Sequence, residues 1–211
     1  MTRGLLKLIG KTPVILSVGS YDGKHERKML AIRPKATIHA IEACKKNYKY
    51  VVRRLKGKAK TYRCAIGPTT GPINFFVMNS EKKEGSSESN SLFEGAVSGK
   101  KEVKKYKTKE VQCYTLDDFM KNNRIHYIDL LKLNCEGGEY GIFEADTLEF
   151  LNHVDVISAS FHAKVPFFNS EVFIQKRKRI YSILEYAGFQ IVVGKKRLTH
   201  DSHIDTVWRK Q

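Results

Sequence analysis

Pro13–Gly19 (PVILSVG) is the stretch that decides the fold. It is a short apolar run that ends at a glycine, which is typical of a strand buried on both faces in the centre of a parallel sheet. A sheet of that kind needs helices on both faces, so the chain around the run should alternate between strand and helix. The flanking sequence follows this alternation.

The segments that follow Gly19 alternate between helix and strand. The predicted elements are a helix over His25–Ile32, a strand over Ala36–Ala43 (ATIHAIEA), a helix over Lys45–Leu55 with Tyr48, Val51, Val52 and Leu55 on one face, and a strand over Thr61–Ile66 closed by Gly67–Pro68. This spacing predicts right-handed crossovers and a parallel sheet.

The remaining segments complete a mostly parallel α/β sheet. We expect strands over Ile73–Met78, Asp129–Cys135 (DLLKLNC) and Val154–Phe161, and an extended Val103–Tyr114. We expect helices at Thr115, which caps the first, after Glu136–Gly138 as far as about Leu151, and over Glu171–Ala187. Gln190–Val193 and Ile204–Arg209 should form a hairpin. No repeat or linker divides the chain, so residues 1–211 form one domain. This outline matches the seven-stranded sheet of Rossmann-like class I methyltransferases, which has a C-terminal antiparallel hairpin, better than it matches a dehydrogenase.

Composition narrows the class of protein. The chain has 211 residues, 10% of them aromatic, which excludes a largely disordered protein. No apolar run approaches the roughly 18 residues that cross a bilayer, and the N-terminus lacks signal-peptide features, so we expect a cytoplasmic protein with no membrane partner. The four cysteines form no C-x-x-C pair and His200–His203 is typical of a polar turn, so we predict no metal site.

The formal net charge is +16. A surface of this kind attracts polyanions, so a nucleic acid partner is one interpretation. Simple solvation by scattered lysines is the other, since no arginine–aromatic interleaving is present. Charge alone leaves both open.

The loop after the first strand has the pattern of a close ligand approach. Gly19 and Gly23 form G-x-x-x-G, which suits adenosylmethionine better than a pyrophosphate, although a structural tight turn gives the same pattern. Glu42 ends the second strand, where a carboxylate can bind both hydroxyls of a ribose or can start a helix. The candidate cofactor residues from these segments are Gly19, Ser20, Tyr21, Asp22, Gly23, Glu42 and Ala43, with Ala65 and Ile66 flanking the adenine.

Polar side chains also end the Asp129–Cys135 strand. Alternation places Lys132, Asn134 and Glu136 on one side, the last two near the mouth of the pocket, where they can orient a hydroxyl or take its proton. An ordinary strand end with a solvated acid cluster is the alternative.

The motifs VGSYDG, IHAIEA, CAIG, SNSL, TLDDF and IDLLKLNCEGGEYGIFE, in order from Val14 to His162, resemble the FkbM-type methyltransferase family. The specific part is TLDDF with KLNCEGGE. The resemblance implies a Rossmann-like fold, S-adenosylmethionine as methyl donor, and O-methylation of a hydroxyl on a sugar or natural product. It also implies that the serine-rich loop around Ser86–Leu92, within residues 80–102, closes over the substrate as a lid.

Three positions depart from the family pattern. Ser17 replaces the acid of the first motif, Asn134 replaces the acid of K-I-D, and Ser160 stands where a glutamate precedes His162. Ser17 and Asn134 can still hydrogen-bond the methionine end or the substrate. His162, with an ordinary pKa near 6.5, becomes the candidate general base, unless it only caps a strand end.

These observations lead to one hypothesis and two rivals. We expect an S-adenosylmethionine-dependent O-methyltransferase whose catalytic candidates are His162, Asn134, Glu136 and Lys132, acting on a hydroxyl-bearing small molecule or glycan. An RNA ribose 2′-O-methyltransferase is the first rival, and a catalytically silent adenosylmethionine-binding or basic scaffold protein is the second. Oligomeric state stays open.

Overall fold

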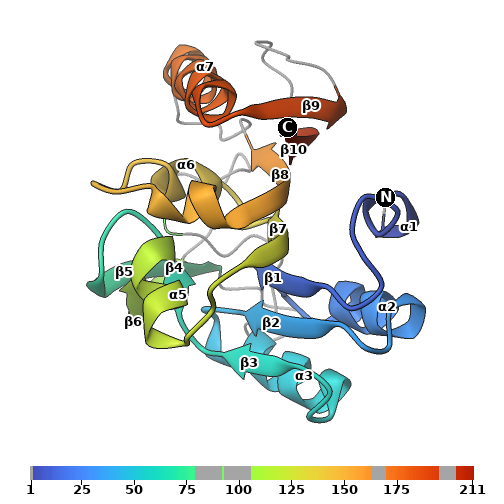
Figure 1. Ribbon diagram of the computed structural model, residues 1–211. Coiled ribbons are helices and arrows are strands. Elements are labelled where there is room, and N and C mark those ends of the chain that lie inside the picture. Colours follow the sequence, from blue (N-terminus) through green and yellow to red (C-terminus); the bar gives the residue numbers. More distant parts are fainter. Residues whose placement is uncertain (1, 79–91, 93–105, 163–169, 195–202) are drawn as a thin grey trace.

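The computed structural model describes residues 2–78, 92, 106–162, 170–194 and 203–211. A seven-stranded sheet runs through it in the order β3-β2-β1-β7-β8-β10-β9 (Figure 1). Its strands are β1 (Val14–Val18), β2 (Thr37–Ile41), β3 (Lys60–Tyr62), β7 (Ile128–Leu133), β8 (Val154–His162), β9 (Phe189–Val193) and β10 (His203–Lys210). All neighbours are parallel except β10, which pairs antiparallel with β8 and β9. The predicted Rossmann-like methyltransferase fold is confirmed.

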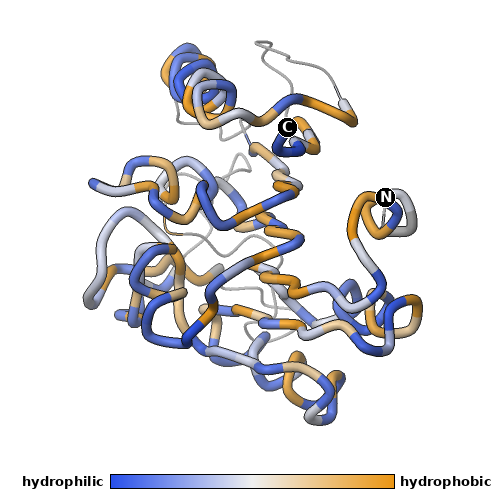
Figure 2. The backbone as a smooth tube through the Cα atoms, in the orientation of Figure 1, coloured by the Kyte–Doolittle hydropathy of each residue, from blue (hydrophilic) through white to orange (hydrophobic). Residues whose placement is uncertain are grey.

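Helices cover both faces because successive residues of the central strand point to opposite sides. Ile15 packs in the core shared with α1 (Thr2–Leu5) and α2 (Lys24–Ile32), and Leu16 packs in the core of the other face. That second core takes residues from α5 (Leu116–Asn122), α6 (Gly138–Ile142) and α7 (Ser170–Tyr186). Figure 2 shows apolar segments along the central strands and mixed helices around them.

The third strand differs from its prediction. Thr61–Ile66 is two strands, because the chain leaves the main sheet after Tyr62 and Ala65–Ile66 forms β4 of a second, three-stranded sheet. That sheet has the order β4-β6-β5, with β5 over Gly71–Met78 and β6 over Tyr106–Tyr114. Ala65 pairs with Cys113 of β6, which draws this segment away from β2.

Two helix predictions also need correction. In α3 (Lys45–Leu55) Val52 is 42% exposed, and Asn47 is buried in its place. The single helix expected after Glu136–Gly138, as far as about Leu151, is instead the short α6 and a 3₁₀ turn, η1 (Glu149–His153). Asp117 of α5 fixes the start of η1, since its carboxylate accepts hydrogen bonds from the hydroxyl of Thr147 and the backbone N–H of Phe150.

One helix cap is confirmed, and two other predictions concern segments outside the described residues. Thr115 caps α5 as expected, accepting a hydrogen bond from the N–H of Asp118 at 3.2 Å. The lid segment 80–102 lies outside the described residues apart from Leu92, and so does most of the predicted His200–His203 turn. In the described part of the chain, no helix has both the length and the apolarity to cross a membrane.

Gly19 is the position where a side chain is least compatible with this fold. Its φ is +80°, and a Cβ there would lie 2.0 Å from the carbonyl oxygen of Asn134 at the end of β7. We expect Gly19→Ala to lower the free energy of unfolding by about 1–3 kcal/mol, because strain and a backbone clash add. Denaturant melts measure the loss. Gly10→Ala, which meets nothing within 4 Å, is the control, and equal stability of the two variants would contradict the close packing.

Candidate functional site

A cavity of about 220 Å³ opens at the carboxyl ends of β1, β2 and β7. Ligands of open α/β sheets bind at this edge. Among the predicted cofactor residues, Gly19, Ser20, Tyr21, Asp22, Glu42, Ala43, Ala65 and Ile66 line the cavity, together with Lys132, Asn134 and Glu136. The structure therefore brings together residues from four separate segments.

The loop after β1 is fastened to the end of β2. The backbone N–H groups of Gly19 and Ser20 both donate to the carbonyl of Ile41, at 3.1 and 3.0 Å. Gly23 does not line the cavity. It begins α2 with a φ of +75°, and a Cβ there would lie 3.3 Å from the Cα of Val51, so its role is to let the loop pack on α3.

Glu42 is a buried carboxylate at the centre of this cavity. It is 6% exposed and accepts the backbone N–H groups of Tyr21 at 2.8 Å and Cys44 at 2.9 Å, one on each oxygen. Burial raises its pKa to about 7 even though these hydrogen bonds favour the charged form. The side chain of Asn47 adds a third hydrogen bond to this carboxylate. The carboxylate keeps a lone pair that can accept a ligand hydroxyl.

The small sheet forms the apolar side of the cavity. Ala65 and Ile66 line the cavity on this side, and Phe75 of β5 joins them. Phe75 and Asn47 are lining residues that the sequence analysis missed. Alternation along Ile73–Met78 would have pointed to Phe75, whereas no sequence signal marks Asn47.

Ser17 lies outside the cavity lining. It is fully buried in β1, and its hydroxyl donates to Oε1 of Glu26 in α2 at 2.6 Å. The expectation that Ser17 touches the methionine end of a cofactor finds no support in this placement, because the loop covers it.

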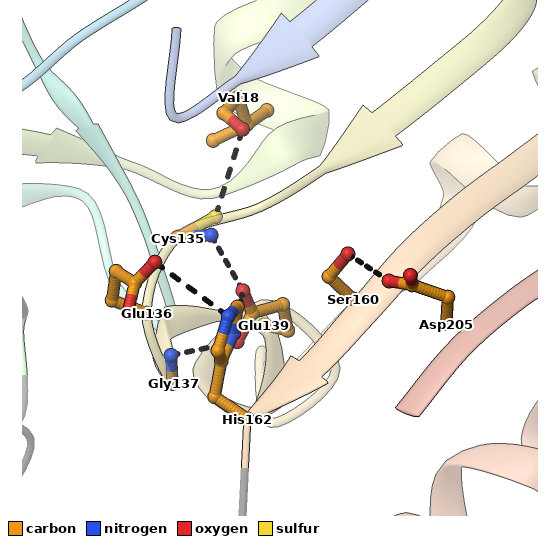
Figure 3. A network of polar contacts seen from close by, with 8 residues as sticks. All are labelled: Val18, Cys135, Glu136, Gly137, Glu139, Ser160, His162 and Asp205. Carbon is orange, nitrogen blue, oxygen red and sulfur yellow. Dashed lines mark hydrogen bonds and ion pairs between the residues drawn. The ribbon is translucent and has the colours of Figure 1, made fainter. Parts of the chain in front are cut away.

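A polar network follows β7. Glu139 is completely buried, accepts the N–H of Gly137 at 2.8 Å and that of Cys135, and contacts Nδ1 of His162 at 3.2 Å. Nε2 of His162 lies 3.6 Å from Glu136. Figure 3 shows the two glutamates approaching the imidazole from the same turn. The Gly137–Gly138–Glu139 run lay within the quoted motif, yet the sequence alone did not assign Glu139 a role.

The pKa predicted for His162 is wrong. Burial alone would lower it, but the hydrogen bond to Glu139 and the charges of Glu139, Glu136 and Asp205 together raise the pKa to about 9. At neutral pH the ring is therefore an imidazolium held between two carboxylates. It cannot accept a proton until the pH approaches 9.

A second cavity of about 260 Å³ adjoins the first, and the two share His25, Lys132 and Asn134. Its polar lining comes from β8 and β10, and its apolar lining comes mainly from α1 and α2. The further residues are Ser158, Ser160, His162 and Asp205, with Leu5, Met29 and Leu133. The candidate site thus has two lobes that meet at Lys132 and Asn134, and all four catalytic candidates line one lobe or both.

Comparisons with known proteins agree with this geometry. The sequence matches the family model described as "Methyltransferase FkbM domain" over residues 17–191. No curated protein matches the chain in sequence.

Solved structures show the same fold. TrmK of M. capricolum, solved with S-adenosyl-homocysteine, has a TM-score of 0.51 at 13% identity, covering 100% of this chain and 67% of that one. The Methanococcus jannaschii fibrillarin pre-rRNA processing protein has a TM-score of 0.52 at 11% identity, covering 96% and 68%. A putative rRNA methylase from Clostridium thermocellum reaches 0.56 at 4% identity, covering 99% and 92%.

The raised pKa of His162 predicts a pH-dependent stability. Because its folded pKa of about 9 exceeds the ordinary 6.5, the group stabilises the fold fully below about pH 6.5, and this contribution is lost as the pH rises through 9. The stability difference between wild type and His162→Asn should therefore shrink by about 1–3 kcal/mol from pH 6 to pH 9.5. Denaturant melts at three pH values measure it, with exposed His126→Asn as the control. A difference that does not change with pH would contradict the assignment.

Proposed function

This chain belongs to the FkbM methyltransferase family and is an S-adenosylmethionine-dependent methyltransferase, and from that premise we propose that it methylates a hydroxyl group of a small molecule. The observation that carries the proposal is the second cavity, which joins the cofactor lobe at Lys132 and Asn134. An acceptor held there would meet the donor at that junction.

The residues of the first lobe fit S-adenosylmethionine. The Glu42 carboxylate can accept a hydrogen bond from a ribose hydroxyl, and Ala65 and Ile66 offer apolar contact to an adenine. The loop from Gly19 to Asp22 lies where the methionine part would be held. When bound, this cofactor supplies a methyl group on a sulfonium, which is already activated for transfer. The protein is left mainly with the alignment of the acceptor oxygen.

The second lobe suits a small hydroxyl-bearing molecule. Ser158 and Asp205 can exchange hydrogen bonds with hydroxyls, and Leu5 and Met29 can pack against the apolar face of a ring. A volume of about 260 Å³ favours one ring over an extended polymer segment. A monosaccharide or a similar polyol has this combination of size and polarity.

We assign the acceptor proton to Glu136. Asn134 lines both lobes and can orient the acceptor hydroxyl, while Glu136 stands at the rim of the first lobe. When the acceptor hydroxyl is methylated, its proton would pass to the Glu136 carboxylate. The His162 imidazolium, 3.6 Å away, holds that carboxylate in position.

Methylation of an RNA ribose is a second candidate, favoured by the net charge of +16. Exposed Lys45, Lys49 and Arg53 of α3 follow shortly after the cavity residues Glu42 and Ala43. A basic helix in this place can hold a phosphate backbone, and its contribution to binding would fall steeply with salt.

Binding of S-adenosylhomocysteine tests the role of Glu42. Because its pKa is about 7, a lower pH protonates the carboxyl and removes hydrogen-bond acceptors, so affinity should fall below pH 7 and level off above it. Glu42→Gln should bind about 10–100-fold more weakly at pH 8, with little pH dependence. Calorimetric titrations measure both. Exposed Glu110→Gln is the control, and an unchanged affinity in Glu42→Gln would refute the assignment.

Product analysis tests the function. With methyl-labelled S-adenosylmethionine, a panel of monosaccharides and glycosides should yield S-adenosylhomocysteine and a methyl ether, while short RNAs stay unlabelled. Glu136→Gln should reduce kcat by about 10²–10⁴-fold. The wild-type rate should stay level from about pH 7 to pH 8 and fall as the pH passes 9, because His162 then loses the charge that holds Glu136.

Three outcomes would contradict parts of this proposal. A rate that rises towards pH 9 would make His162 the base instead of Glu136. Label on RNA would favour the ribose methyltransferase. Binding of S-adenosylmethionine with no turnover of either class would favour a silent scaffold.

A further inference from the structure

Glu26 is a buried carboxyl that the proposed reaction does not use. It lies in the first turn of α2 and is 0% exposed. Its Oε1 accepts the hydroxyl of Ser17 at 2.6 Å, whereas its Oε2 has no hydrogen-bond donor in the described part of the chain. A buried carboxylate with one unsatisfied oxygen is unfavourable unless a cation compensates it.

No described side chain supplies that cation as an ion pair. The nearest strand neighbour with a positive charge is Lys132, which pairs in register with Ser17 and so projects from the same face of the sheet. The ion pairs of the described residues join Lys24 and Arg54 to Asp22, His162 to Glu136 and Glu139, and Lys176 to Glu144, and none of them includes Glu26.

The charge of Glu26 reaches the cofactor lobe. It is one of the causes that raise the pKa of Glu42, and it opposes the lowering of the pKa of His25, and both residues line that cavity. Glu26 is also tied to the start of the lining loop: its partner Ser17 directly precedes Val18 and Gly19, which line the cavity.

We propose that Glu26, held by Ser17, is the counter-charge for the amino group at the methionine end of S-adenosylmethionine. Glu26 does not line the cavity, so it acts on the amino group through its charge, as a positioning residue. Ser17 of β1 stands where the family pattern has an acid, and in this proposal Glu26 of α2 provides the carboxylate instead. The inference concerns the cofactor and holds whichever acceptor the enzyme uses.

Three ligands separate this role from a purely structural one. S-adenosylmethionine carries both an ammonium and a sulfonium, S-adenosylhomocysteine carries only the ammonium, and 5′-methylthioadenosine carries neither. Glu26→Gln keeps the size of the side chain and can keep the hydrogen bond from Ser17 but loses the charge. We expect this variant to bind S-adenosylhomocysteine about tenfold more weakly and to bind 5′-methylthioadenosine as tightly as wild type does.

Calorimetry with the full-length protein measures the dissociation constants, and Glu171→Gln, an exposed first-turn acid of α7, is the matched control. Equal weakening of both ligands would mean that Glu26 only shapes the loop, and would overturn the proposal. If Glu26→Gln binds S-adenosylmethionine more weakly but S-adenosylhomocysteine normally, Glu26 acts on the sulfonium. That result would overturn the proposal as well.

An exchange of the two residues keeps the test decisive if Glu26→Gln does not fold. Ser17→Asp combined with Glu26→Ser returns the acid to β1 and the hydroxyl to α2, so it should bind S-adenosylhomocysteine within about threefold of wild type. Ser17→Asp alone places two carboxyls together and should bind more weakly. A folded double variant that binds no better than this single variant would refute the pairing.

Discussion

The close approach of β1 and β7 at their carboxyl ends is the constraint on which the site depends. Gly19 lies against the carbonyl of Asn134 at a distance that excludes any side chain. The N–H groups of Gly19 and Ser20 are meanwhile directed to Ile41 of β2. The loop after β1 thus contacts the ends of both β2 and β7. Because it carries no side chain at Gly19, residues from these two strands can line the same cavity.

Three buried carboxyls surround this point, and each has a different degree of compensation. Glu139 accepts two backbone N–H groups and contacts an imidazolium. Glu42 accepts two backbone N–H groups and has no cation beside it among the described ion pairs, which is why burial raises its pKa to about 7. Glu26 accepts one hydroxyl. The number of hydrogen-bond donors among the described residues therefore decreases from Glu139 to Glu26.

The sequence predicted the features that depend on local pattern. The apolar run before Gly19 identified the central strand, and the glycine spacing with Glu42 located the first lobe, because backbone conformation and strand ends are encoded within a few residues. It did not predict that Ala65 would join Cys113 in a separate sheet, since that pairing joins residues 48 positions apart. The pKa of His162 was missed for the same reason: its partner Glu139 is 23 residues away in the sequence.

The departures from the family pattern make physical sense once neighbouring elements are considered. Ser17 donates to Glu26 of α2, and Ser160 donates to Asp205 of β10. At both positions a serine on a central strand holds a carboxyl that comes from the adjacent element. A carboxylate placed on a hydrogen-bonded neighbour keeps its charge near the site while the strand keeps a small side chain. Ser17 and Ser160 thus each hold a carboxyl that the linear pattern does not reveal.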